Sequence, residues 1–185
     1  QRAYLENTEM GEASQYLDLV NLMTYDMTGE WADSTGHHAG LFASSYNEGG
    51  PSVAKTVRMF RDAGVPSGKL VVGIPFYGRG WSNVPPPNNG VGQPGEGIDD
   101  VRLWYEDIVD DFIPDPDYEN FWDESARAPF LYNKKDSVFI TYENPRSIAG
   151  KCRFIEENNL KGAMFWQYFT DHEEALLNAI YNGLY

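Results

Sequence analysis

Three short apolar runs recur along the chain, and each one ends abruptly in polar and aromatic residues. They lie at residues 17–23, 69–74 and 162–166. Continuous apolar runs of this length, without alternation, are typical of parallel strands that are buried on both faces. We therefore expect three strands of a parallel sheet, the first of which is covered on both sides.

Helical periodicity separates these runs. One apolar stripe begins at Ser52 and stops at Gly64, a second begins at Asn144, and a third spans about Glu173–Tyr181. Serine and asparagine are favoured helix starts, and glycine is a favoured helix end. A helix between the first and second runs makes a βαβ unit, so these two strands should be parallel neighbours.

The character of the chain changes between the second run and Asn144. Residues 82–97 are rich in proline and glycine, which predicts an irregular exposed loop. Residues 101–112 have a helical pattern, and two strands are expected at 128–132 and 137–141, joined by a hairpin turn. We interpret residues 76–143 as a small α+β insertion on an α/β framework.

Composition narrows the choice of ligand. The 185-residue chain has a formal net charge of −14, which disfavours nucleic acid and anionic membrane surfaces as partners. It holds twelve Tyr, ten Phe and five Trp, more aromatic surface than a core alone requires.

The single cysteine excludes an internal disulfide, and the adjacent His37 and His38 lack a carboxylate at ligand spacing, so no metal site is expected.

The residues at the ends of the three runs suggest a shared binding face. Tyr25, Asp26 and Trp31 follow the first run, Tyr77 follows the second, and Trp166 closes the third. The carboxyl ends of parallel strands meet at one rim of a barrel, where chemistry is usually placed. Aromatic faces with carboxylate and phenol groups suit a neutral, polyhydroxylated ligand. The alternative is structural: Asp26 caps the next segment and Tyr25 fills a gap.

These motifs resemble glycoside hydrolase family 18, the chitinases. The resemblance covers essentially the whole chain and rests on LMTYDMTGEW (22–31), KLVVGIPFYGRGW (69–81), LKGAMFW (160–166) and, in the insertion, WDESARAPFLY (122–132). It implies an α/β fold, namely the C-terminal part of a (β/α)8 TIM barrel, strands six to eight, with an inserted α+β subdomain. The domain boundaries we expect are 1–75 for the first barrel segment, 76–143 for the insertion and 144–185 for the second barrel segment.

The resemblance also implies roles for individual residues in a reaction without a cofactor. Tyr25 would hydrogen-bond the acetamido carbonyl of the sugar next to the scissile bond, and Asp26 would bind a sugar hydroxyl near that bond. Trp166 would form the platform under this sugar, and Trp31 would stack on the next one.

Two further substrate contacts are implied, and each has a structural alternative. Met23 would line the pocket floor, although it could equally fill the core. Arg127, from the insertion, would reach sugar hydroxyls along one wall, although it could also serve as a surface ion-pair partner.

One part of the family pattern is missing from the sequence. Family 18 enzymes carry a catalytic glutamic acid in a D-x-x-D-x-D-x-E motif on the fourth strand, and the chain contains no such motif. Three strands also cannot close an eight-stranded barrel.

We expect either a fragment of a complete chitinase or two copies that cover each other's open edges, and we expect this chain alone to be inactive. A chitin-binding, lectin-like relative that has lost the acid is the alternative function, and a half-barrel that scaffolds protein partners is a third. Secretion is implied by the resemblance.

Overall fold

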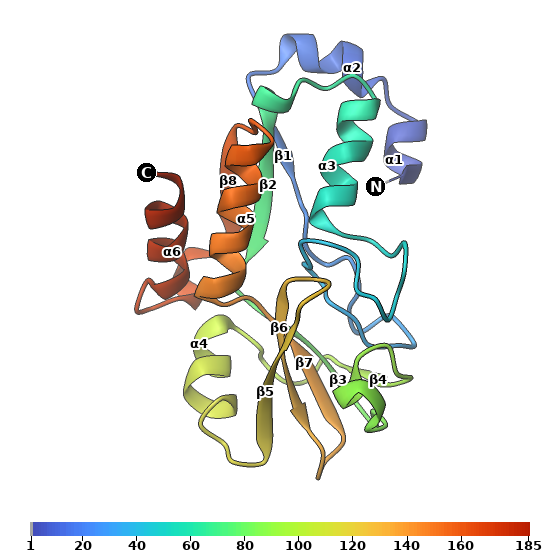
Figure 1. The fold of residues 1–185 in the computed structure, drawn as a ribbon, viewed down its shortest axis with the longest axis vertical. Coiled ribbons are helices and arrows are strands. Elements are labelled where there is room, and N and C mark those ends of the chain that lie inside the picture. The colour runs from blue at the N-terminus through green and yellow to red at the C-terminus, as the bar shows by residue number, and fades with distance from the viewer. Residues whose placement is uncertain (1) are drawn as a thin grey trace.

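The computed structural model describes residues 2–185, which form two sheets joined end to end (Figure 1). The first is parallel, with the order β1-β2-β8, and consists of β1 (Val20–Leu22), β2 (Leu70–Pro75) and β8 (Gly162–Trp166). Val20 lies opposite Leu70, and Val72 lies opposite Ala163. The three predicted strands and their parallel pairing are therefore confirmed.

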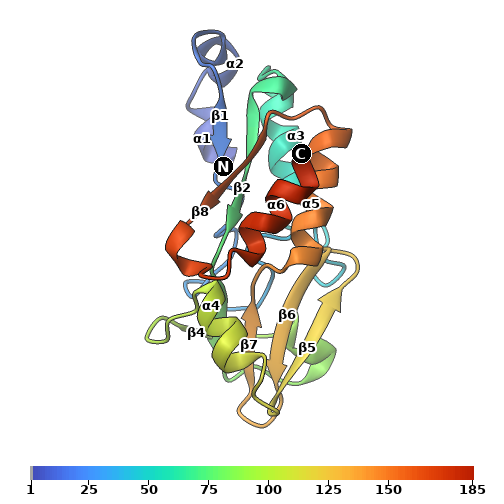
Figure 2. The same ribbon diagram turned by 90° about the vertical axis from the view of Figure 1, so that its left-hand side faces the viewer.

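Helices α3 (Val53–Asp62), α5 (Pro145–Glu157) and α6 (Ala175–Leu184) pack against one side of this sheet (Figure 2). The Ser52 hydroxyl accepts a hydrogen bond from the Lys55 N–H at the start of α3, and the Asn144 side chain accepts one from the Ser147 N–H at the start of α5. Gly64, at φ +92°, follows the end of α3. The predicted helix starts at Ser52 and Asn144 are thus confirmed, and both side chains act as N-caps. Two short helices, α1 (Arg2–Glu6) and α2 (Met10–Ala13), precede β1.

The first strand is shorter and more exposed than predicted. Only Val20–Leu22 pairs with β2, while Leu17, Leu19 and Met23 are exposed. The expectation of a strand buried on both faces is therefore wrong. The reason is that the helices cover only one face of the sheet, so Val20 and Leu22 are buried while Asn21 between them is exposed.

The second sheet is antiparallel, lies between β2 and α5 in the sequence, and has the order β4-β3-β7-β6-β5. Its strands are β3 (Arg79–Ser82), β4 (Glu96–Ile98), β5 (Tyr118–Asp123), β6 (Ala128–Asn133) and β7 (Val138–Thr141). The β6–β7 hairpin confirms the two predicted strands, but β3, β4 and β5 were not predicted. Glycine lies within β3 and β4, and β5 (YENFWD) mixes aromatic and acidic residues without strict alternation, so none of them carries a clear apolar period.

The predicted helix over 101–112 is confirmed only from Tyr105 to Phe112, and residues 101–104 are not helical. A single helical turn, α4 (Tyr105–Asp107), continues as a π-helical turn to Phe112. Before it, the Gly78 N–H donates to the Leu103 carbonyl, and the Tyr105 N–H donates to the Phe76 carbonyl. These bonds hold the chain extended beside the end of β2, so the apolar residues at its start belong to a bridge rather than to a helix.

Each sheet has its own core. The larger core lies between the parallel sheet and its helices and extends to Leu131 and Ile140 of the second sheet, whereas Trp81, Phe130 and Phe139 belong to the smaller core on the other face of that sheet. The domain boundaries at 75/76 and 143/144 are retained as a proposal. Among the described helices, none is long and apolar enough to cross a membrane.

Candidate functional site

An open cleft of about 380 Å³ lies where the carboxyl ends of the parallel strands meet the second sheet. Asp26 follows β1, Tyr77 follows β2, and Trp166 is the last residue of β8. All three line the cleft. The opposite wall comes from the second sheet and the bridge before α4, and includes Arg79 and Trp104. The predicted convergence of the strand ends is therefore seen in the structure.

Asp26 is the most strongly held acidic group in the cleft. Its Oδ1 accepts hydrogen bonds from Nε and Nη2 of Arg79, both at 2.9 Å, and lies 3.8 Å from Nδ1 of the buried His38. Partial burial alone would raise the pKa of Asp26, but His38, Arg79 and Tyr77 outweigh it and lower the pKa to about 2. Asp26 is thus ionised near neutral pH, which makes it a hydrogen-bond acceptor and rules it out as a proton donor.

Two tyrosines lie beside this carboxylate. The rings of Tyr25 and Tyr77 meet edge to face with their centroids 6.2 Å apart. Burial and the negative charge of Asp26 raise the pKa of both phenols. Both hydroxyls therefore stay protonated and can donate a hydrogen bond. Gly73 makes room for this arrangement, because a Cβ there would lie 2.9 Å from Cε1 of Tyr25 and 2.4 Å from the Leu22 carbonyl oxygen.

Arg79 connects Asp26 to the predicted stacking residue Trp31. Its Nη1 lies 3.0 Å from Oε2 of Glu30, and its guanidinium carbon lies 5.4 Å from the centre of the Trp31 ring. Trp31 is 59% exposed and its ring covers Gly29. Arg79 was not predicted to be a site residue. A cation within the aromatic tip FYGRGW was the available signal.

Trp166 offers the largest open aromatic surface in the cleft. It is 56% exposed and lines the cleft together with Trp104, whose ring meets that of Phe169 at 5.4 Å. The guanidinium carbon of Arg102 lies 4.3 Å from the centre of the Trp104 ring. Trp104 and Arg102 were also missed, since they fell within the stretch that was read as a helix. The arrangement combines a flat apolar platform with an anionic acceptor and neutral phenol donors.

Comparison with known proteins decides the family. The model of the glycosyl hydrolases family 18 matches residues 1–171. The chain belongs to this family. Chitinase A1 of Niallia circulans is 34% identical over 96% of the chain and 27% of its own length. A family 18 N-acetylglucosaminidase from Paenibacillus barengoltzii has a TM-score of 0.91 at 37% identity, over all of the chain and 54% of that structure. A family 18 chitinase from Cycas revoluta, solved with (GlcNAc)3, has a TM-score of 0.79 at 31% identity, over 92% of the chain and 48% of that structure.

The match extends over only part of each relative. The chain spans about a quarter to a half of the length of these family 18 proteins. Within the chain the parallel sheet is open, since its outer strands β1 and β8 each pair with a strand on one side only.

Two predicted site residues lie elsewhere in this family 18 chain. Met23 is 67% exposed and borders an apolar groove with Tyr4 and Phe60. The guanidinium carbon of Arg127 lies 5.1 Å from the centre of the Phe42 ring. Neither residue lines the cleft, and their sugar contacts remain predictions.

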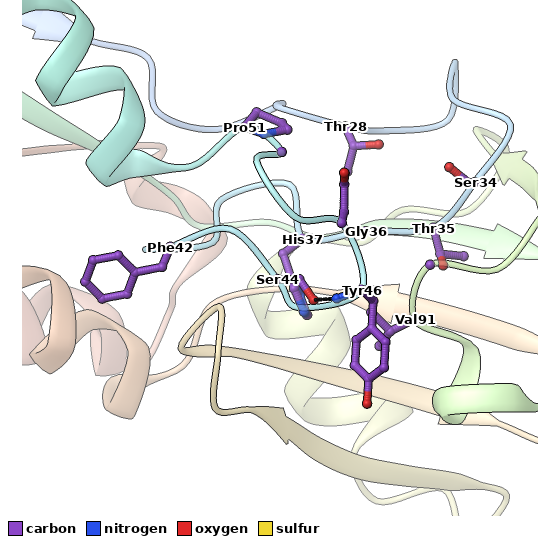
Figure 3. A pocket seen from close by; sticks show the side chains of 13 residues that line it. Thr28, Ser34, Thr35, Gly36, His37, Phe42, Ser44, Tyr46, Pro51 and Val91 are labelled. Atoms are coloured by element: carbon purple, nitrogen blue, oxygen red, sulfur yellow. Dashed lines mark hydrogen bonds between the residues drawn. The ribbon is translucent and has the colours of Figure 1, made fainter.

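The adjacent histidines point to different neighbours. His38 lies next to Asp26, with its ring 5.5 Å from that of Tyr77, whereas Nε2 of His37 lies 3.1 Å from Oδ2 of Asp123. No group of three or more metal-ligating side chains is found among residues 2–185. His37 also lines a cavity of about 60 Å³ between loops, together with Tyr46 (Figure 3). This cavity has room for a few water molecules but not for a sugar ring.

Proposed function

We propose that this chain forms the sugar-binding part of a family 18 active site, and that the protein carrying it hydrolyses β-1,4-linked N-acetylglucosamine polymers. The observation that carries this proposal is the cleft itself, where the ionised Asp26 lies beside two neutral tyrosines and the exposed Trp166. The trisaccharide bound by the Cycas revoluta relative supports the choice of sugar.

In this proposal each side chain acts on a different part of the sugar beside the scissile bond. The Trp166 ring packs against the apolar face of that sugar, while the Tyr25 hydroxyl donates a hydrogen bond to the acetamido carbonyl. Asp26 accepts a hydrogen bond from a hydroxyl or amide N–H near the bond. Family 18 enzymes use the acetamido oxygen as the nucleophile, which makes them a substrate-assisted exception to the two-carboxylate scheme. The negative charge of Asp26 stabilises the positive charge that develops on the acetamido group.

The proton for the leaving oxygen must come from another group. Asp26 is ionised, and the sequence contains no D-x-x-D-x-D-x-E motif. We propose that the catalytic acid lies outside these 185 residues, and that the chain alone binds chitooligosaccharides without cleaving them.

The open edges of the parallel sheet give the missing part a place to bind. Unpaired edge strands with exposed apolar residues normally need a cover. We propose that further barrel strands, or a second copy of the chain, pair with β1 and β8. An extracellular location is proposed with this function, because chitin is an insoluble polymer.

A binding protein without hydrolysis is the second candidate. It is favoured by the same cleft, whose own residues hold and orient a sugar but donate no proton. Both candidates predict sugar binding, and only the first predicts turnover.

Trp166→Ala tests sugar binding in the cleft. Calorimetric titration with chitotriose should show binding to the wild type and at least about tenfold weaker binding to the variant, because the stacking platform is lost. Tyr181→Ala is the matched control, since Tyr181 is similarly exposed on α6 outside the cleft. Chitotriose affinity that is unaffected by Trp166→Ala, or absent from the wild type, would overturn the assignment.

A further inference from the structure

A second groove, of about 330 Å³, lies along the outer edge of the second sheet. It is bordered by β5, β6 and two loops, and it shares no residue with the sugar-binding cleft, which borders β3 and β4 at the opposite edge. We propose that this groove is a second binding site for chains of N-acetylglucosamine. The proposal rests on the proposed function, because it assigns the same class of polymer to a separate surface.

Tyr46 is the most exposed aromatic residue that lines this groove, and the backbone of its loop is held by hydrogen bonds. The residue is 51% exposed, yet its N–H donates to the Ser44 hydroxyl at 3.2 Å (Figure 3). The same hydroxyl donates to Oδ2 of Asp123 at 2.6 Å, and the Ser45 N–H donates to the Ser125 hydroxyl at 2.8 Å. A ring on a fixed loop loses little conformational entropy when a sugar stacks on it.

The base of Tyr46 is also packed. A Cβ added at Gly92 would lie 3.2 Å from Cβ of Tyr46, so the two loops are in close contact. The floor of the groove is formed by Phe121 and Phe130, whose rings are stacked 5.3 Å apart. An exposed tyrosine therefore stands beside an apolar floor of defined shape.

Polar groups complete the groove. Asn88 and Asn89 are exposed and have positive φ angles of 56° and 50°, a conformation that asparagine tolerates. Their amides can donate to and accept from hydroxyl and acetamido groups. Glu124, on the facing turn, pairs through Oε1 with Nη2 of Arg146 at 3.0 Å, and its other carboxylate oxygen adds an acceptor to the groove. An aromatic ring with neutral amides and a carboxylate is the chemistry that recognises a neutral amino sugar.

Such a site would raise the affinity of the protein for a polymer. A chain bound in the cleft extends beyond it, and a second contact on the same molecule increases the local concentration of substrate. An oligosaccharide too short to contact both sites at once would not bind more tightly through this effect, whereas insoluble chitin would.

Titration with chitohexaose in a Trp166→Ala background, in which binding in the cleft is weakened, exposes binding in the second groove. We expect Trp166→Ala to retain binding, and Tyr46→Ala in the same background to weaken it by at least about tenfold. Replacing both Asn88 and Asn89 by glycine removes the amides while keeping the positive φ angles, and should also weaken it. Tyr181→Ala in the same background is the control and should leave the affinity unchanged. Circular dichroism verifies that each variant is folded.

The outcomes separate the two proposals. If the wild type binds chitohexaose but Trp166→Ala abolishes all binding, the second groove is refuted and the cleft stands. Residual binding that ignores Tyr46→Ala also refutes the groove. No binding by the wild type would overturn the proposed function and the groove together.

Discussion

Asp26 shows how one residue can be positioned by its neighbours for a narrow chemical task. It lies in a left-handed backbone conformation at the end of β1, paired with Arg79 and close to His38. Because these neighbours favour the charged form, Asp26 can accept hydrogen bonds and stabilise positive charge. The same residue in a solvated loop would also be ionised at neutral pH, but it would have no fixed direction.

The low pKa of Asp26 makes a prediction about acid stability. A carboxyl group whose pKa in the folded state is about 2 stabilises the protein above its ordinary value of 3.8, and this contribution is lost as the pH falls toward 2. The difference in unfolding free energy between the wild type and Asp26→Asn should therefore be largest above pH 4 and shrink toward pH 2. Urea denaturation between pH 2 and 6 measures it, and parallel curves for the two proteins would contradict the account.

A second residue-scale prediction concerns the buried ion pair of Glu143 and Lys151. Both side chains are almost fully buried, and Ser147 donates a further hydrogen bond to Glu143. Lys151→Met would leave the carboxylate buried without its cation, at a cost of about 3–5 kcal/mol in unfolding free energy. Removing both charges with Glu143→Leu and Lys151→Met should cost less. Urea denaturation of both variants provides the comparison, and equal losses would contradict it.

At the scale of elements, the cleft depends on the close approach of β4 to the loop after β1. A Cβ at Gly97 would lie 2.1 Å from the Glu30 carbonyl oxygen and 2.3 Å from its Cα. These are backbone atoms, so the clash cannot be relieved by turning a side chain. The loop that presents Trp31 is therefore fixed by the absence of a side chain in a neighbouring strand.

Gly97→Ala should both destabilise the protein, by about 1–3 kcal/mol, and weaken chitotriose binding, because β4 and the Trp31 loop must separate. Gly68→Ala is the matched control, since a Cβ added at Gly68 would have no heavy atom within 4 Å. Thermal unfolding and calorimetric titration of both variants test this. Equal behaviour of the two alanine variants would contradict the packing argument.

The elements that the sequence predicted are those with a strong local signal. β2 is apolar at every position. Helices α3 and α5 each have an N-cap side chain and an apolar stripe. β3 and β4 form only through long-range pairing around glycine, and the bridge near Leu103 is held by hydrogen bonds to residues 76 and 78. Such pairings leave no period in the sequence, which is why residues 101–104 were wrongly assigned to the helix that follows them.

The candidate site followed the same rule. Tyr25, Asp26, Trp31 and Trp166 stand at strand ends within recognisable motifs. In the structure Asp26 and Trp166 line the cleft, while Tyr25 and Trp31 lie beside it, in contact with the lining residues Tyr77 and Arg79. Arg79 was missed because its contribution depends on its contacts with Asp26 and Trp31, which are distant in the sequence.

At the scale of the whole molecule, the chain joins an open three-stranded parallel sheet to a five-stranded antiparallel one (Figure 1). The cleft lies at their junction. The antiparallel sheet has its own core, so it can hold one wall of the cleft rigid. The parallel sheet has open edges, and we propose that the residues at its carboxyl end bind and orient a sugar. In the proposed function, substrate binding therefore lies within these residues, and proton donation lies outside them.

Chitohexaose hydrolysis, followed by mass spectrometry of the products, tests this separation most directly. The 185-residue chain alone should leave chitohexaose intact, and a longer protein that contains the chain together with the family's acid motif should cleave it to shorter oligosaccharides. Cleavage by the pure chain would contradict the account, as would an inactive longer protein.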